Sequence, residues 1–287
     1  MSTIRSRPYL WIMAVVALVA GLGVTVLLNR GAGETSRPAA IADPGTPPAT
    51  AAPTSEAPVA AAKAPPADLP VVAYAKGPRG LPDDPAPESV VPITEAMRPA
   101  TKTALYDAPG GEPLAFLPPR ISGLATVVPI VARANGWAAV LVPATNRKVG
   151  WVPTAGWQAE TLRDQLMVDL SERSLIWLRA GEEQARWSVA IGTKRTPTPL
   201  GRTYVMGITG TSGAAFAGLD ALVLGSVPED PEKMAASLQK AHTGIHAWSN
   251  SAVFGRNVSN GCVRMPPKAQ RKLLDQVAPG TPVVVTA

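Results

Sequence analysis

The stretch GIHAWSNSAVFGRNVSNGCVRM, residues 244–265, contains the only cysteine of the chain and one of its two histidines. Cys262 directly follows Gly261, and Arg264 lies two positions further on. His246 precedes the cysteine in the same stretch. An imidazole near a thiol can accept its proton and so convert the sulfur into a nucleophile. The stretch therefore predicts a cysteine nucleophile, Cys262, with His246 as its base.

The neighbours of Cys262 supply the other groups that acyl transfer requires. Gly261 allows a substrate to approach closely, and we expect the backbone N–H groups of Gly261 and Cys262 to stabilise a developing oxyanion. Arg264 lies on the same face as Cys262 if the segment is extended, where it could bind a carboxylate through two hydrogen bonds. Nucleophile, base and anion stabiliser are thus all present in one short segment.

Simpler explanations exist for each residue taken alone. A lone cysteine is commonly a small buried hydrophobic residue, and a histidine on an apolar strand can belong to the core. His242, the second histidine, could serve as the base in place of His246. His242, His246 and Cys262 could also hold a catalytic zinc ion, but the usual spacings of zinc ligands are absent. We therefore expect no metal.

On either side of this stretch the sequence predicts mainly β structure with short helices. Residues 167–192 form three alternating apolar runs separated by turn residues, which is typical of a β-meander. A short helix is expected at residues 230–240, where an Asp N-cap precedes a proline at the first helical position. A second helix is expected at Pro267–Val277, followed by a last strand at residues 281–285.

Further upstream, short apolar runs alternate with turn residues over residues 102–157, a spacing typical of a small antiparallel barrel. Residues 98–157 resemble a bacterial SH3-like domain. The resemblance rests on the Tyr106-x-x-Pro109 opening, the central Gly136-Trp137 and the closing Gly150-Trp151-Val152. Tryptophans of such a barrel fill its core more often than they stack on a ligand.

Residues 31–97 are dominated by Pro, Ala, Gly, Ser and Thr and contain few large apolar side chains. Such a composition cannot bury enough apolar surface to offset the entropy of ordering the chain. We expect a disordered Pro/Ala-rich linker that carries no chemistry.

The N-terminal residues 1–30 are predicted to be a cytoplasmic tip followed by one transmembrane helix. Residues 9–28 are uncharged and apolar, which is long enough for a helix to cross a hydrocarbon core of about 30 Å. Arg5 and Arg7 precede this segment, so the rest of the chain is expected to face outward. A cleaved signal peptide is the alternative, but its apolar region is normally shorter.

The formal net charge of +6 does not indicate a nucleic-acid partner. Arg5, Arg7 and Arg30 supply three of these charges, and residues 1–30 contain no acid. No basic run with interleaved aromatic residues remains in the rest of the chain. The modest excess fits weak attraction to an anionic wall or membrane surface.

Residues 164–287 resemble the YkuD-type L,D-transpeptidase catalytic domain. Its signature pairs a histidine, here His246, with Ser-x-Gly-Cys-x-Arg, here Ser259–Arg264. A second match lies upstream at Gly192, Thr196–Pro199 and Gly201. The chain departs from the family after the histidine, where Ala247-Trp248 stand in place of Gly or Ser and then Thr.

The resemblance implies a β-sandwich catalytic domain with short helices, in which Cys262 attacks an acyl group and His246 carries protons. A backbone carbonyl is then expected to orient the imidazole. No cofactor is implied. By the resemblance, Ser259 and Arg264 shape the substrate side of the loop. We expect Asn260 and His242 to contribute to substrate binding as well.

By the same resemblance, the substrates are peptidoglycan stem peptides, as both donor and acceptor, and the product is a 3,3 cross-link formed through a thioester. Carbapenems are expected to acylate the cysteine. Water, a protein or an amino acid could replace the acceptor, and water would give an L,D-carboxypeptidase. A non-catalytic wall-binding scaffold is a further alternative. The expected location is the bacterial cytoplasmic membrane, in a single pass, with the catalytic domain in the periplasm or cell-wall space.

Overall fold

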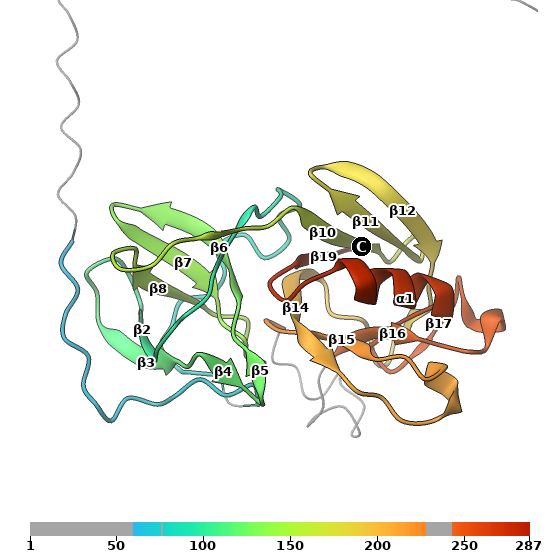
Figure 1. The fold of residues 1–287 in the computed structure, drawn as a ribbon, viewed down its shortest axis with the longest axis horizontal. Helices are drawn as coiled ribbons and strands as arrows, with labels where there is room; N and C mark the ends of the chain where they lie inside the picture. Colours follow the sequence, from blue (N-terminus) through green and yellow to red (C-terminus); the bar gives the residue numbers. More distant parts are fainter. Residues whose placement is uncertain (1–59, 76, 228–242) are drawn as a thin grey trace, which may run out of the picture. The chain divides into compact units, whose positions relative to one another are not determined.

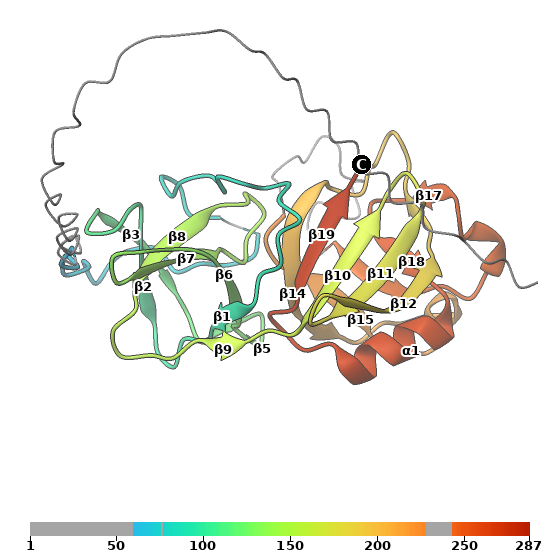
Figure 2. The same ribbon diagram turned by 90° about the horizontal axis from the view of Figure 1, so that it is seen from above.

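A computed structural model describes residues 60–75, 77–227 and 243–287, which belong to one compact unit, Ser55–Ala287 (Figures 1 and 2). These residues form a mainly β structure with few helices, as the sequence predicts. The helices of the described residues are short: α1 (Pro267–Gln276) and the 3-10 turns η1 (Ala214–Phe216) and η2 (Ser251–Val253).

Two sequence predictions fall outside these ranges, namely the membrane span at residues 9–28 and the helix at residues 230–240. Within the ranges that the structure describes, no helix has both the length and the apolar character needed to cross a membrane.

The N-terminal sheet is antiparallel and has seven strands in the order β3-β2-β8-β7-β6-β1-β9. The bounds of these strands are β1 (Glu95–Met97), β2 (Thr103–Tyr106), β3 (Pro113–Leu117), β6 (Val128–Ala134), β7 (Trp137–Leu141), β8 (Val149–Pro153) and β9 (Glu160–Thr161). A separate ribbon joins β4 (Arg120–Ile121) to β5 (Leu124–Ala125). Trp137 is buried, as expected for a core tryptophan, whereas Trp151 is partly exposed. The antiparallel character agrees with the sequence, and the SH3-like assignment stays a prediction.

The C-terminal sheet is mixed and has eight strands in the order β12-β11-β10-β19-β14-β15-β16-β18. Their bounds are β10 (Asp164–Asp169), β11 (Ser174–Arg179), β12 (Glu182–Ser188), β14 (Gly201–Thr209), β15 (Ala221–Leu224), β16 (Gly244–Ala247), β18 (Val263–Met265) and β19 (Pro282–Thr286). A small parallel pair joins β13 (Ile191–Gly192) to β17 (Asn257–Ser259). The predicted meander is confirmed by β10, β11 and β12, which pair in sequence.

Helix α1 begins at Pro267 because a proline at the first helical position lacks only an N–H that would have no partner there. It buries Ala269, Gln270 and Leu273, and the Gln270 Nε2 donates to the Asp220 carbonyl at 2.8 Å. Helix α1 and the last strand both lie where the sequence predicts them.

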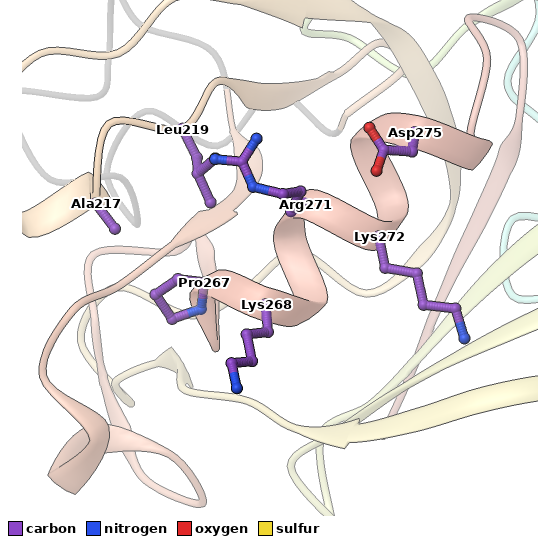
Figure 3. Close-up of a pocket in the computed structure, with 7 residues that line it drawn as sticks. All are labelled: Ala217, Leu219, Pro267, Lys268, Arg271, Lys272 and Asp275. Atoms are coloured by element: carbon purple, nitrogen blue, oxygen red, sulfur yellow. The ribbon is translucent and has the colours of Figure 1, made fainter.

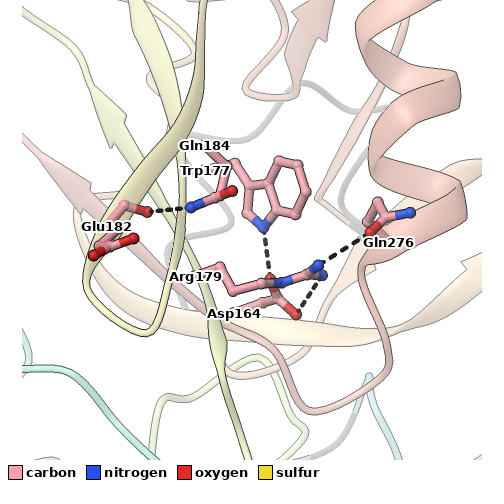
Figure 4. Close-up of polar contacts among 6 residues, drawn as sticks. All are labelled: Asp164, Trp177, Arg179, Glu182, Gln184 and Gln276. Atoms are coloured by element: carbon pink, nitrogen blue, oxygen red, sulfur yellow. Dashed lines mark hydrogen bonds and ion pairs between the residues drawn. The ribbon is translucent and has the colours of Figure 1, made fainter.

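Asp164, the first residue of β10, joins three elements (Figure 4). Its carboxylate accepts hydrogen bonds from Trp177 Nε1 at 2.7 Å and from Arg179 Nε at 2.8 Å, both on β11. Arg179 also donates to Gln276 at the end of α1, at 3.2 Å. These bonds attach the meander to the end of the helix.

The predicted linker is wrong for the described residues between 60 and 97. Val72 and Leu81 are among the buried side chains of this segment, and the Val72 N–H donates to the Phe116 carbonyl on β3 at 2.8 Å. Composition misled here because a few well-spaced apolar residues are enough when the folded sheet offers them sites and main-chain partners.

A buried ion pair fastens this segment to the C-terminal sheet. Arg202 on β14 donates from Nε to Asp84 Oδ2 at 2.6 Å, and a second bond joins Arg202 Nη2 to Asp84 Oδ1. The two side chains are 7% and 1% exposed. A buried charge that loses its partner is strongly destabilising, so this contact holds the segment around Asp84 against β14.

Candidate active site

The parallel pairing of β16 and β18 brings the predicted functional residues together. His246 lies opposite Arg264 in this pair, and Cys262 directly precedes β18. Strand β18 is the edge strand of the C-terminal sheet, and β16 lies next to it. Both strands are short and largely buried, so the backbone that carries each functional side chain is held in place.

A cavity of about 450 Å³ opens over these residues. It is lined by Thr209, Phe216, Ala221, Leu222, Val223, Thr243, Gly244, His246, Trp248, Asn260, Cys262 and Arg264. Cys262 is a free, partly exposed thiol. The cavity therefore includes the predicted nucleophile, the predicted base and two of the predicted substrate-binding residues, Asn260 and Arg264. His242, the fourth of those, lies outside the described residues.

Ser259 does not line this cavity. Its side chain is fully buried, and its hydroxyl donates to the Cys262 carbonyl at 2.5 Å. The same oxygen accepts a hydrogen bond from the Gly261 N–H at 3.2 Å. In the structure Ser259 thus shapes the loop that carries the cysteine, and its role in substrate binding stays a prediction.

The hydrogen bond to Ser259 also affects the predicted oxyanion site. The Gly261 N–H is already engaged inside the loop, which leaves the Cys262 N–H as the better candidate of the two predicted donors. Gly261 has a φ of 115°, a region that side-chain-bearing residues rarely adopt, so the turn itself requires glycine.

The segment of the second sequence match, residues 192–201, contacts the loop that carries Cys262. The Thr193 N–H and the Thr196 hydroxyl both donate to the Ser259 carbonyl, each at 3.2 Å. Gly192 accepts no larger residue, because a Cβ atom there would lie 2.3 Å from the Thr196 carbonyl oxygen. The two matching segments are therefore parts of one structure that holds Cys262.

His246 is 7% exposed, and its Nδ1 lies 2.9 Å from the Ala247 carbonyl oxygen. A donating Nδ1–H there leaves Nε2 as the free acceptor. Burial lowers the pKa of His246, the hydrogen bond to Ala247 opposes that shift, and the charge of Arg264 adds to it. The imidazole is consequently neutral at physiological pH and able to accept a proton.

Burial raises the pKa of the Cys262 thiol above its usual value. A backbone hydrogen bond from Gly244 and the positive charge of Arg264 act in the opposite direction without overcoming it. Burial therefore favours the thiol form of Cys262 at rest over the thiolate. No hydrogen bond joins Cys262 to His246 among the described residues, and such contacts commonly tighten only when substrate binds.

Two aromatic residues of the cavity were not found by sequence reasoning about the site. Phe216 lies 4.9 Å from His246 between ring centroids, and Trp248 lies 5.8 Å from both. The guanidinium of Arg264 stacks on Trp248 at 3.8 Å. The departure from the family pattern at Trp248 was the available signal, but its contact with Arg264 depends on the register of β16 and β18.

A second hollow lies along α1 and has a different character (Figure 3). Its charged residues are mainly basic, namely Lys268, Arg271 and Lys272, with Asp275 as the acid. It has no cysteine or histidine. Among the residues that the structure describes, no group of three or more His, Cys, Asp or Glu side chains is arranged to hold a metal ion.

Residues 163–285 match the family model of the L,D-transpeptidase catalytic domain, YkuD. A Bacillus subtilis protein that bears the name L,D-transpeptidase YkuD is 27% identical over 125 residues, which is 44% of this chain and 67% of that protein. A protein of the same name from Bacillus licheniformis is 27% identical over 127 residues, or 44% and 68% of the two chains.

Among solved structures, the catalytic domain of an E. faecium L,D-transpeptidase is 25% identical, covers 43% of this chain and 96% of its own, and gives a TM-score of 0.31. An L,D-transpeptidase from Mycobacterium smegmatis is 14% identical, covers 69% and 100%, and gives 0.39. Because these scores are low, the assignment rests on the sequence matches. By those matches, residues 163–285 of this chain are similar to L,D-transpeptidase catalytic domains.

Proposed function

We propose that this protein is a peptidoglycan L,D-transpeptidase that forms 3,3 cross-links through a thioester on Cys262. The observation that carries the proposal is the shared cavity, in which Cys262, His246 and Arg264 lie together inside the segment matched by the family model. The names of the relatives point to the same reaction class.

In the first half-reaction, His246 Nε2 accepts the thiol proton while the Cys262 sulfur attacks the carbonyl that joins a diamino acid to D-Ala. The raised pKa of Cys262 and the lowered pKa of His246 favour a neutral pair at rest, so proton transfer accompanies the attack. The C–N bond breaks, the imidazolium returns the proton to the leaving amine, and D-Ala departs. The stem peptide remains on sulfur as a thioester.

In the second half-reaction an amine of another stem attacks the thioester. His246 takes the proton of that amine, the C–S bond breaks, and the sulfur recovers a proton as the new amide forms. The Cys262 N–H is our candidate to stabilise the oxyanion in both steps.

Arg264 is proposed to bind a carboxylate of the stem peptide. The side chain lines the cavity that contains Cys262. A guanidinium placed there can donate charge-assisted hydrogen bonds to a carboxylate that enters. Trp248 holds the guanidinium plane in position for that contact.

Other acceptors use the same chemistry. Water would make the protein an L,D-carboxypeptidase, and a protein or amino acid could replace the second stem. The cavity wall is rich in apolar and aromatic side chains, including Phe216, Leu222 and Trp248. Such a wall disfavours water at the thioester, so we place the stem peptide first.

The membrane anchor at residues 9–28 is also part of the proposal. The reaction takes place outside the cytoplasm, where peptidoglycan stems are found, and an anchor there keeps the enzyme near its substrate. Fractionation of cells that produce the full chain, with alkaline extraction, would detect the protein in the membrane pellet. Release by alkali would contradict an uncleaved span.

The function is tested by incubating the chain from residue 60 with defined tetrapeptide muropeptides, followed by mass spectrometry of protein and products. A cross-linked dimer with loss of D-Ala supports the transpeptidase. A trimmed tripeptide alone supports the carboxypeptidase, and unchanged muropeptides would contradict both. Cys262→Ser is the control that should lose the thioester.

A further inference from the structure

A pair of aromatic side chains on the N-terminal sheet holds the main chain of residues 60–63. Trp137 Nε1 donates a hydrogen bond to the Ala60 carbonyl at 2.9 Å, and the Tyr106 hydroxyl donates to the Lys63 carbonyl at 2.6 Å. The two rings pack edge to face with centroids 5.0 Å apart. Both acceptors are backbone atoms, so the contact depends on the backbone conformation of residues 60–63 and not on their side chains.

The spacing of the two carbonyls fits an extended helix of the polyproline II type. Ala60 and Lys63 are three residues apart, and three residues make one turn of that helix. Polyproline II has no internal hydrogen bonds, so its carbonyls are free to accept bonds from other groups. The following residues, Ala64-Pro65-Pro66, favour the same conformation.

Close contact with the sheet surrounds these two bonds. A Cβ atom on Gly110 would lie 2.8 Å from the Ala60 Cβ, so Ala60 packs directly against the turn between β2 and β3. Lys63 forms an ion pair with Glu112 in the same turn, but both side chains are more than half exposed and contribute little.

A second attachment lies further along the segment. The Phe116 N–H donates to the Pro70 carbonyl, and the Val72 N–H donates back to the Phe116 carbonyl, each at 2.8 Å. The segment is therefore fixed to β3 after residue 70 and to the aromatic pair before residue 64. Figures 1 and 2 show this blue segment beside the strands of the N-terminal sheet.

We propose that Tyr106 and Trp137 form a binding site for an extended chain rich in Ala and Pro, and that residues 60–66 of the protein occupy it in cis. A second extended peptide of the same class competes with residues 60–66 for the two donors. This inference does not depend on the proposed reaction at Cys262.

The test uses the full chain and a variant in which residues 60–66 are replaced by a Gly/Ser sequence of equal length. A peptide of residues 58–68 is titrated into each protein, and tryptophan fluorescence reports binding. The peptide should bind the variant at least about ten-fold more tightly, because a tethered ligand competes at a millimolar effective concentration. Failure to bind the variant, or equal affinity for both proteins, would overturn the proposal.

A matched pair of tyrosine variants checks the contact itself. In the Gly/Ser variant, Tyr106→Phe removes one donor and should weaken the peptide about five-fold. Tyr204→Phe is the control, since the buried Tyr204 hydroxyl has no partner among the described residues. If the Gly/Ser variant fails to fold, trypsin cleavage after Lys63 in the native sequence replaces the titration. Tyr106→Phe should then accelerate that cut relative to Tyr204→Phe, and equal rates would contradict the site.

Discussion

The guanidinium carbon of Arg264 lies 3.8 Å from the centroid of the Trp248 ring, on the wall of the cavity that contains Cys262. A tryptophan face attracts a guanidinium and limits the directions in which it can point. Arg264 also lines that cavity, so the stacking limits the orientations in which its guanidinium can meet a ligand. We therefore expect Trp248 to act as a positioning residue, through Arg264.

Replacing Trp248 by alanine should raise KM for a tetrapeptide donor about ten-fold, which corresponds to a cation–π contact of about 1 to 2 kcal/mol. Trp248→Phe keeps an aromatic face and should recover much of the loss. The rate at which a small thiol-reactive reagent modifies Cys262 should change little, because that reagent needs no carboxylate contact. If Trp248→Ala weakened the reaction with the tetrapeptide donor and with the reagent equally, Trp248 would have only a structural role.

The two histidines can be separated by their effect on carbapenem acylation. His246→Ala should slow formation of the Cys262 adduct by about 10² to 10⁴, because the thiol loses its proton acceptor. His242→Ala removes an expected substrate-binding side chain but not the expected base, so it should slow the reaction much less than His246→Ala. Intact-protein mass spectrometry over time gives both rates. The reverse order of effects would make His242 the base.

The pH profile of acylation should show the two shifted pKa values. Lowered pKa keeps His246 neutral, so adduct formation should persist at about pH 6, where an ordinary imidazole is largely protonated. The raised pKa keeps Cys262 in its thiol form. The rate of alkylation by iodoacetamide should therefore continue to rise with pH beyond the pH range in which an ordinary cysteine titrates. Alkylation that is already maximal at neutral pH would contradict the raised pKa.

Asp84→Asn should lower the free energy of unfolding by about 3 to 5 kcal/mol, because Arg202 is then left buried without a charged partner. Asp83→Asn is the neighbouring control. Asp83 pairs with Lys148 but is 83% exposed, so its loss should cost less than about 1 kcal/mol. Urea denaturation of the two variants gives the comparison, and similar midpoints would argue against a buried pair.

Removing residues 60–97 should lower the melting temperature, whereas removal of a disordered linker would leave it unchanged. A chain that starts at residue 60 retains the contacts described here, whereas one that starts at residue 98 loses the buried side chains of Val72 and Leu81 and the pair made by Asp84. Calorimetry of the two chains measures the difference. Identical transitions would restore the linker interpretation.

The sequence predicted those parts of the fold whose residues follow a regular pattern. The meander of β10 to β12 has alternating apolar residues and clear turns, and α1 begins at a proline. The segment at residues 60–97 has no such period. Its contacts are made by isolated side chains such as Leu81 and by main-chain carbonyls such as that of Lys63, which composition does not encode.

The candidate site was predictable in its residue types and less so in their roles. The spacing around Cys262 singled out His246, Asn260, Cys262 and Arg264 of the residues that line the cavity, because nucleophile, base and cation are rare in combination. The inward direction of Ser259 and the engagement of the Gly261 N–H are consequences of the loop geometry. Similarly, burial sets the direction of the Cys262 pKa, and burial is a property of the folded chain.

The position of β19 has a consequence for how the protein folds during synthesis. This strand, Pro282–Thr286, lies between β10 and β14 and pairs with both, so it joins the meander to the strands that lead to Cys262. Synthesis runs from the N-terminus, so β19 leaves the ribosome after β10, β14 and β18 of the same sheet. The sheet that carries Cys262 therefore cannot close until residues 282–286 have emerged, so a shorter nascent chain carries Cys262 without an assembled site.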